Sequence, residues 1–274
     1  MSTLGVVVTG ATGRMGGRII HHLHDIEGVA LVAATDRPGS SHVGLDAGLA
    51  AGIGAVEIPV HDVLTDALDA AGERARVIID FTTAEASAVH AAVAAERGLG
   101  LVVGSTGFDD ATRAAVEAAA TKVPVVMAPN MSTSVNLMIA LSRIAAEVLG
   151  DEYDVEILEA HHRGKKDAPS GTALRLGEVV AKALGREFGQ VGVFGRRGNV
   201  GERPRREIGV HALRGSDVVG EHTVYYFGDG DRLEITHRAG SRDTFARGAV
   251  RAARWVAEQP AGLYGMAEVL GFGS

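Results

Sequence analysis

The sequence contains no cysteine, which excludes disulfide bonds, thiolate metal sites and cysteine nucleophiles. This absence fits a protein that works in the reducing cytoplasm. Aromatic residues are also scarce, at 4% of the 274 residues, whereas 46% of the chain is hydrophobic. The core is therefore expected to consist of alanine, valine, leucine and isoleucine, as in proteins whose helices pack on a parallel sheet.

No run of apolar residues approaches the ~18 that a membrane-spanning helix needs, and the N-terminus lacks a secretory pattern. We therefore expect a soluble, cytoplasmic protein without membrane contact. The formal net charge of −7 argues against general binding of nucleic acid. The length is sufficient for two domains of ordinary size.

One polar stretch, residues 159–173, lies between a run with the alternation of a strand, 153–158, and a run with helical spacing, 174–184. Proton donors are dense in it: His161, His162, Lys165 and Lys166. Ser170 is placed to cap the helix, so the backbone N–H groups of the next three residues are expected to face an anion. We expect a site for a small anionic molecule that also needs a proton, although a serine-capped helix after a solvated basic turn would contain the same residues.

A glycine-rich turn follows the first apolar run, 4–9, and precedes a run with helical spacing. The turn consists of Gly10, Ala11, Thr12, Gly13, Arg14, Met15 and Gly16. Its glycines would let the backbone approach a pyrophosphate at the start of the helix. A second predicted strand, 29–35, ends at Asp36 and Arg37, where an adenosine ribose would lie. Asp36 could accept from a ribose 2′-hydroxyl and Arg37 could pair with a 2′-phosphate, so NADH and NADPH are both compatible with the sequence.

Three further apolar runs, 77–81, 101–104 and 123–127, alternate with helical stretches at 84–96 and 109–121. Such alternation is typical of parallel βαβ units, so we predict an α/β fold with a Rossmann-like, doubly wound parallel sheet. Each of these strands ends in small polar residues, and ligands of open α/β sheets bind at the carboxyl ends of strands. The turns are therefore expected to border the nicotinamide, although plain turn chemistry explains any one of them equally well.

After a helix predicted at 133–149, three runs alternate apolar with polar residues: 207–213, 221–227 and 232–237. This alternation indicates a sheet with one exposed face, hence a second domain of α+β type with a mostly antiparallel or mixed sheet. The arginine-rich interval 196–206 is expected to be a mobile, subunit-contacting or solvated loop. The predicted domains span 1–131, 132–241 and 242–274, the last being helices that return to the first domain.

Several short motifs are distributed along nearly the whole chain. They are 159–165 with 167–173, Gly10 to Gly16, Asp80-Phe81-Thr82, Gly104-Ser105-Thr106-Gly107, Ala128-Pro129-Asn130-Met131-Ser132, Gly220-Glu221-His222 and Thr236-His237-Arg238-Ala239. This set resembles the 4-hydroxy-tetrahydrodipicolinate reductase family, also called dihydrodipicolinate reductases, of bacterial lysine and diaminopimelate biosynthesis. Ser134 and Ser105 depart from the family pattern, which usually has glycine and threonine at these positions.

The resemblance implies a homotetramer, with residues 132–241 binding the substrate and forming the tetramer. It implies that 4-hydroxy-tetrahydrodipicolinate is reduced, via dihydrodipicolinate, to tetrahydrodipicolinate by hydride from NADH or NADPH and a proton from His161. By motif match, Lys165 would be the catalytic partner of His161. The substrate carboxylates would be held by His162, Lys165, Ser170, Gly171 and Thr172. The cofactor would be held by the glycine turn, Asp36, Arg37, Phe81, Thr82, Gly104, Ser105, Thr106, Ala128, Pro129, Asn130 and Met131.

Three other functions are compatible with parts of the sequence. An amino-acid dehydrogenase acting on aspartate or homoserine would share the two domains, but it gives no reason for the double-histidine signature. A non-catalytic nucleotide sensor would need neither His161 nor Lys165. Metal-dependent hydrolysis by His161 and His162 is disfavoured, because adjacent residues on an extended segment point to opposite sides. We expect no metal.

Overall fold

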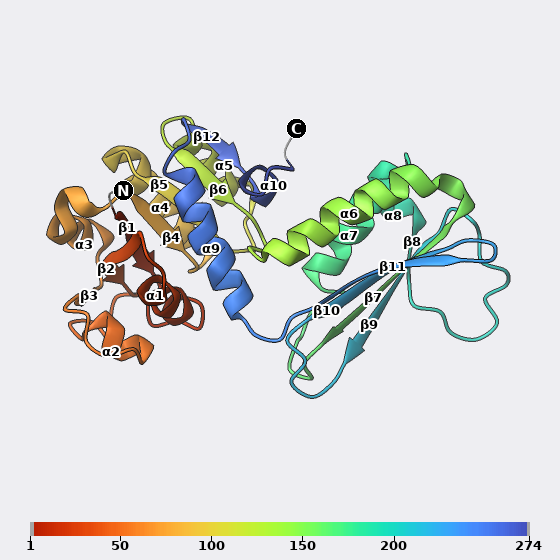
Figure 1. The fold of residues 1–274 in the computed structure, drawn as a ribbon, viewed down its shortest axis with the longest axis horizontal. Helices are drawn as coiled ribbons and strands as arrows, with labels where there is room; N and C mark the ends of the chain where they lie inside the picture. The colour runs from red at the N-terminus through yellow and green to blue at the C-terminus, as the bar shows by residue number, and fades with distance from the viewer. Residues whose placement is uncertain (1–2, 273–274) are drawn as a thin grey trace. The chain divides into compact units, whose positions relative to one another are not determined.

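The computed structural model describes residues 3–272, which divide into two compact units (Figure 1). The first unit runs through Thr133 and resumes at Arg242, and the second is Ser134–Ser241. Each unit has its own sheet; the first unit has two hydrophobic core clusters, one on each face of its sheet, and the second unit has one.

The first unit contains a seven-stranded sheet in which every neighbouring pair of strands is parallel. Across the sheet the strands are β12 (Gly262–Tyr264), β6 (Pro124–Met127), β5 (Gly100–Val103), β4 (Val77–Asp80), β1 (Leu4–Thr9), β2 (Val29–Thr35) and β3 (Val60–His61). The chain starts at β1 and winds outward in both directions. This order confirms the predicted Rossmann-like, doubly wound parallel sheet.

Helices cover both faces of this sheet. One face carries α1 (Gly16–Asp25), α9 (Asp243–Val256) and α10 (Met266–Val269), with α2 (Ala47–Ala51) beside α1. The other face carries α3 (Leu64–Ala71), α4 (Ala84–Arg97) and α5 (Asp110–Ala120), with η1 (Gly72–Arg74) after α3. Strand β1 shows why helices must cover both faces of the sheet. Its side chains are apolar on each face, because Val6 and Val8 belong to one core and Val7 belongs to the other.

The second unit contains a five-stranded mixed sheet. Across the sheet the strands are β11 (Arg232–Arg238), β10 (Glu221–Phe227), β7 (Asp154–His161), β9 (Ile208–Arg214) and β8 (Gly192–Phe194). Strand β10 is antiparallel to both of its neighbours, whereas β7, β9 and β8 are parallel to one another. The mixed sheet confirms the predicted fold class of this half.

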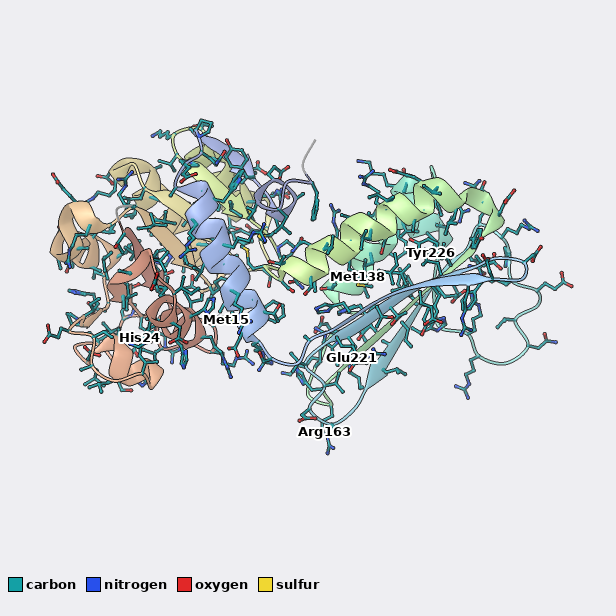
Figure 2. All side chains as sticks on the ribbon, in the orientation of Figure 1. Met15, His24, Met138, Arg163, Glu221 and Tyr226 are labelled. Atoms are coloured by element: carbon teal, nitrogen blue, oxygen red, sulfur yellow. The ribbon has the colours of Figure 1, made fainter. Side chains whose placement is uncertain are left out.

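Helices α6 (Thr133–Leu149), α7 (Gly171–Ala183) and α8 (Phe188–Val191) pack on one face of the second sheet, with η2 (Gly150–Glu152) leading into β7. Tyr226 is fully buried there, and its hydroxyl donates to the carbonyl of Ser142 at 2.6 Å. Figure 2 labels Tyr226 together with Met138, another residue of this core.

The segment Thr133–Glu152 is long and apolar enough to cross a membrane by length and composition alone. It is not an uninterrupted apolar run, because it contains Asn136, Arg143 and Glu147, so the expectation about such runs is not contradicted. The same helix places Met138, Ala145 and Ala146 in the core of the second unit. Packing of this kind is also found in core helices of folded domains, which pass the same test.

Some elements differ from the sequence-based expectations. Strand β7 continues past Leu158 to His161, because backbone pairing with β9 and β10 extends to its end. The short elements β3, β8, β12 and α10 are too brief to show a periodicity. The arginine-rich interval is anchored on the sheet: Arg196 and Arg203 both donate to Glu156. Burial opposes ionisation of Glu156, but these contacts and His211 lower its pKa to about 2.

Candidate active site

The predicted cofactor residues gather at one edge of the first sheet. They follow the carboxyl ends of β2, β1, β4, β5 and β6, which are neighbours in that order and all run parallel. Because parallel strands end at the same edge, the turns after them lie side by side. Ligands of open α/β sheets bind at this edge.

The glycine turn between β1 and α1 is packed closely against itself. Gly10 has a φ of 65°, in the left-handed region that favours glycine. A Cβ on Gly16 would lie 2.1 Å from the carbonyl oxygen of Gly10, and a Cβ on Gly13 would lie 3.1 Å from the same atom. Side chains at these positions would push the turn apart. Met15, labelled in Figure 2, precedes the first residue of α1.

Asp36 follows β2 and contacts the glycine turn. Its carboxylate accepts hydrogen bonds from the hydroxyl of Thr12, from the N–H of Arg37 at 2.8 Å and from the hydroxyl of Ser40 at 3.1 Å. Burial disfavours the charged form, but these hydrogen bonds outweigh it and hold the pKa of Asp36 below its ordinary value. An ionised acceptor therefore lies where a ribose hydroxyl is expected, with exposed Arg37 next to it.

The turns after β4 and β5 are held by a buried carboxylate, Asp80. It accepts from the N–H of Thr82 at 2.9 Å and from its hydroxyl at 2.6 Å, and it pairs with Nδ1 of His90 at 2.6 Å. A Cβ on Gly104 would lie 2.2 Å from the ring of Phe81. The small residue at Gly104 therefore lets the two turns approach closely.

The remaining predicted cofactor residues differ in exposure. Ser105, Ala128 and Met131 are buried, Asn130 is half-buried, and Thr106 and Pro129 are exposed. The hydroxyl of Ser105 bonds to that of Ser87 at 2.8 Å, and the N–H of Ala128 donates to the carbonyl of Val103 at 3.1 Å. The side-chain oxygen of Asn130 accepts from the N–H of Ser132 at 2.9 Å, which shapes the turn after β6.

The predicted acid, His161, is the last residue of β7 and belongs to the second unit. Its Nδ1 lies 2.6 Å from Oε2 of Glu159, a fully buried carboxylate two residues earlier on the strand. An ionised carboxylate only accepts, so Nδ1–H donates and Nε2 is the ring nitrogen that Glu159 does not hold. Oε1 of Glu159 accepts from the N–H of Ser170 at 3.0 Å, which places the acid near the start of α7.

Arg214, at the end of β9, forms a fork on the same carboxylate. Its Nη1 lies 2.8 Å from Oε2 of Glu159 and its Nη2 lies 2.9 Å from Oε1. Nη2 also donates to the carbonyl of Asp167 at 2.7 Å. Burial opposes ionisation of Glu159, but the hydrogen bonds from Arg214, His161 and Ser170 outweigh it and lower its pKa.

The predicted carboxylate-binding residues lie around the start of α7. The hydroxyl of Ser170 caps the helix by accepting from the N–H of Ala173 at 3.2 Å. Gly171 is exposed at the first position of the helix, and Thr172 is half-buried. This confirms Ser170 as the helix cap that the sequence predicts.

The loop between β7 and α7 carries the ammonium of Lys165, whose charge acts on His161. Lys165 forms an ion pair with Asp167, at 2.9 Å, and its backbone N–H donates to the carbonyl of half-buried His162. Arg163, in this loop, and Glu221, at the start of β10, are labelled in Figure 2. All predicted catalytic and substrate residues thus come from one junction between a strand and a helix.

A second histidine, His222 on β10, packs against the acid. The two rings meet edge to face with centroids 5.3 Å apart, and Nε2 of His222 lies 2.9 Å from the hydroxyl of Ser170. Burial, followed by the charge of His161, lowers the pKa of His222 to about 4. Burial also lowers the pKa of His161, with Glu159 opposing the shift and Lys165 and Arg214 adding to it. His222 is therefore a neutral group beside the acid.

Sequence reasoning gave no role to Glu159, Arg214, His222, Asp80 or His90. Glu159 had a signal, because strand alternation places it with the buried residues Val155 and Ile157. A charged residue at such a position needs partners. Arg214 has no comparable local signal.

Two other features bear on function. Within residues 3–272, no group of three or more histidine, aspartate and glutamate side chains is placed to hold a metal ion.

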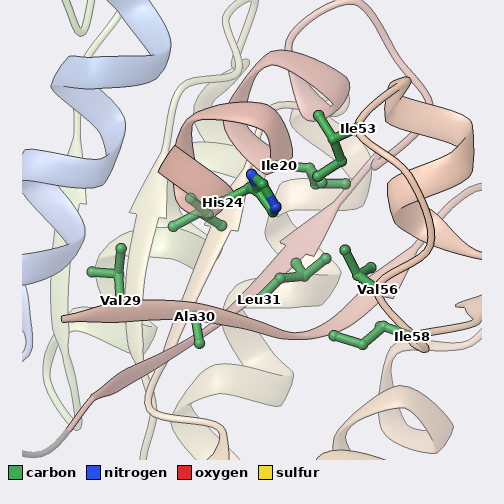
Figure 3. Close-up of a pocket in the computed structure, with 9 residues that line it drawn as sticks. Ile20, His24, Val29, Ala30, Leu31, Ile53, Val56 and Ile58 are labelled. Carbon is green, nitrogen blue, oxygen red and sulfur yellow. The ribbon is translucent and has the colours of Figure 1, made fainter. Parts of the chain in front are cut away.

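A pocket of about 240 Å³ lies between α1, the start of β2 and residues 53–58 (Figure 3). Aliphatic side chains and His24 line it, and none of its lining residues is a predicted site residue.

Comparisons with known proteins identify the family of the chain. Residues 4–131 match the family model "Dihydrodipicolinate reductase, N-terminus", and residues 134–270 match "Dihydrodipicolinate reductase, C-terminus". The 4-hydroxy-tetrahydrodipicolinate reductase of Myxococcus xanthus is 57% identical over 97% of each chain, and that of an Anaeromyxobacter species is 56% identical over 98% of each. A dipicolinate-bound dihydrodipicolinate reductase from a Paenisporosarcina species shares the fold. It has a TM-score of 0.77 and 24% identity, covering 98% of this chain and 100% of that one.

Proposed function

Because the chain belongs to the dihydrodipicolinate reductase family, we propose that its two residue clusters serve the reduction of one cyclic dicarboxylate. The activity is that of a 4-hydroxy-tetrahydrodipicolinate reductase, an oxidoreductase of lysine and diaminopimelate biosynthesis. The resemblance seen in the sequence is thereby confirmed. In the proposed reaction the hydroxylated substrate is reduced via dihydrodipicolinate to tetrahydrodipicolinate.

The first sheet fits a nicotinamide dinucleotide, which supplies a hydride when bound. The support is the glycine turn, where Gly10 has a positive φ and Gly16 packs against its backbone, so that the start of α1, where a pyrophosphate would bind, lies next to the end of β1. Asp36 and Arg37 would hold the adenosine ribose of either NADH or NADPH. The turns after β4, β5 and β6 would border the nicotinamide, with Phe81 packed against Gly104.

His161 would deliver the proton that the reduction requires. Glu159 holds Nδ1–H, so the proton would leave from Nε2. The observation that carries the proposal is that Glu159 contacts both the acid and the N–H of Ser170. A proton donor is thus fixed beside a helix start that can bind a carboxylate.

The substrate carboxylates would be bound around the start of α7. The N–H groups of Gly171 and Thr172 lie in the first turn of that helix, where anions are stabilised. The ammonium of Lys165 and the ring of His162 would complete the site. In this structure Asp167 pairs with Lys165. A substrate carboxylate would therefore either contact Lys165 together with Asp167 or displace Asp167 from it.

We further propose a homotetramer in the cytoplasm. The support for assembly is the face of the second sheet that α6 and α7 do not cover. Phe227 is exposed on it, although its strand neighbour Tyr226 is buried on the other face, and Leu213 on β9 is exposed on the same uncovered face. Phe227 also stacks on Tyr225, with centroids 5.5 Å apart. Sedimentation equilibrium would test the tetramer, and a monomer at assay concentrations would contradict it.

Steady-state kinetics of three variants test the roles in the reaction. His161→Gln is expected to lower kcat by roughly 10²- to 10⁴-fold, the usual contribution of a general acid, and to change KM much less. Lys165→Ala should impair both constants, because a lost clamp weakens binding and misplaces the reacting carbon. His162→Gln is the matched control and should affect KM more than kcat. If His162→Gln abolishes turnover while His161→Gln does not, the two histidines have the opposite roles.

A further inference from the structure

Glu159 is a charged residue at a core position. Its side chain is fully buried, on the strand face that also carries Val155 and Ile157. An isolated buried carboxylate would cost several kcal/mol, so the protein must supply partners for it. Arg214, His161 and the N–H of Ser170 are these partners. These partners also connect the carboxylate to the proposed acid and to the start of α7.

The geometry links the acid to the carboxylate-binding turn. Oε2 of Glu159 faces His161 and Oε1 faces Ser170, while Arg214 spans both oxygens. Arg214 also holds the carbonyl of Asp167, so the loop between β7 and α7 is tied to the same group. A planar guanidinium on a carboxylate fixes the orientation of both groups.

We propose that Glu159 and Arg214 act together as positioning residues for the general acid. Glu159 fixes the ring of His161 and favours its charged form, while Arg214 orients the carboxylate of Glu159 and limits that preference through its own positive charge. This inference rests on the proposed role of His161. It explains why a fully buried carboxylate and an arginine from another strand meet at this site.

The charges around His161 come from every element that packs against it. Glu159 on β7 favours the imidazolium, whereas Arg214 on β9 and Lys165 in the following loop oppose it. His222 on β10 stays neutral beside the ring of His161. On β11, His237 is the residue that pairs with His222. Asp167 lies against Lys165 and Arg214, at 2.9 Å from the ammonium. Removing Glu159 or Arg214 should therefore change the protonation of His161 in opposite directions.

NMR titration of the imidazole of His161 in the protein without ligands measures this directly. The signal is assigned by its loss in His161→Gln. We expect Glu159→Gln to lower the pKa of His161 and Arg214→Met to raise it, leaving the two variants at least about one pH unit apart. The pH above which kcat declines should move in the same two directions, because the acid must be protonated.

The controls separate positioning from general damage. Both variants remove one member of the same buried pair. If this pair has only a structural role, the pKa of His161 should stay unchanged in both variants or shift in the same direction in both. Arg214→Lys keeps the charge but not the fork. It should restore the pKa of His161 close to the wild-type value and leave kcat reduced. If Arg214→Met does not fold, Arg214→Lys still tests the positioning role, because it removes the fork on Glu159 without removing the positive charge.

The two proposals fail in different ways. If His161→Gln keeps a normal kcat, His161 is not the acid and its proposed role in the reaction fails. If His161→Gln is inactive but the pKa of His161 is the same in wild type, Glu159→Gln and the Arg214 variants, the acid stands and the positioning role is overturned.

Discussion

Gly16 and Gly17 offer a matched pair for testing how the glycine turn is built. Both lie in the first turn of α1, so alanine at either position changes helix propensity by a similar amount, up to about 1 kcal/mol in favour of folding. A Cβ on Gly16 would lie 2.1 Å from the oxygen of Gly10 and 2.7 Å from Cα of Ala11. A Cβ on Gly17 would lie 3.9 Å from the oxygen of Ala11, an ordinary contact.

The contacts of Gly16 are with backbone atoms, so the turn itself must move by more than about 1 Å to relieve them. Overpacking of this kind costs about 1–3 kcal/mol, and because the propensity changes cancel, we expect this difference in unfolding free energy between the variants. Displaced turn amides should also weaken NADH binding by at least about tenfold, or ~1.4 kcal/mol.

Urea unfolding followed by circular dichroism measures the first quantity, and calorimetric titration with NADH measures the second. Gly17→Ala should resemble the wild type in both measurements. Equal unfolding free energies and equal NADH affinities for the two variants would refute the close packing of Gly16 against Gly10 and its role in shaping the turn.

Three further predictions concern the cofactor, the substrate and the proton. Because Asp36 at the proposed ribose site would repel a 2′-phosphate and Arg37 would attract it, Asp36→Ala should favour NADPH and Arg37→Ala NADH in kcat/KM; an unchanged ratio in both variants would remove this strand end from the ribose site. The wild type should prefer neither cofactor by more than roughly tenfold. Thr172→Val should raise KM for the dicarboxylate and leave the Kd for NADH unchanged, and equal losses of both would place Thr172 in the cofactor site. The pKa of His161 is lowered in the free protein by burial, so kcat/KM should decline as pH rises through that pKa. Two bound carboxylates favour the imidazolium, so the decline of kcat should occur at higher pH, and coinciding declines would contradict this.

The alternating α/β order of most of the first unit was predictable because most of its strands and helices are long enough to show their period. Strand β1 and helix α4 are examples, with α4 spanning Ala84–Arg97 where a helix was predicted at 84–96. Strand β3 has two residues, and β8 and β12 have three each, so these strands are too short to show an alternation of apolar and polar residues. The mixed sheet was predictable only as a class, because strand pairing is set by contacts between distant segments.

The cluster at His161 was predictable in part. Its histidines, lysine and helix cap lie within one short stretch of sequence, so local reasoning could find them. Arg214 contacts Glu159 from 55 residues away, and His222 contacts Ser170 from 52 residues away. Only the pairing of β7 with β9 and β10 brings them together. The site residues that sequence and motif matches suggest stay predictions until variants are measured.

Reduction of 4-hydroxy-tetrahydrodipicolinate by this chain can be measured directly. The most direct measurement is the initial rate of NADH and NADPH oxidation by the wild-type protein, with substrate generated in situ by the preceding synthase. We predict that both cofactors are oxidised only when that substrate is present, in equal amounts with tetrahydrodipicolinate formed, and that His161→Gln nearly abolishes the rate. Absence of substrate-dependent oxidation with either cofactor would contradict the account.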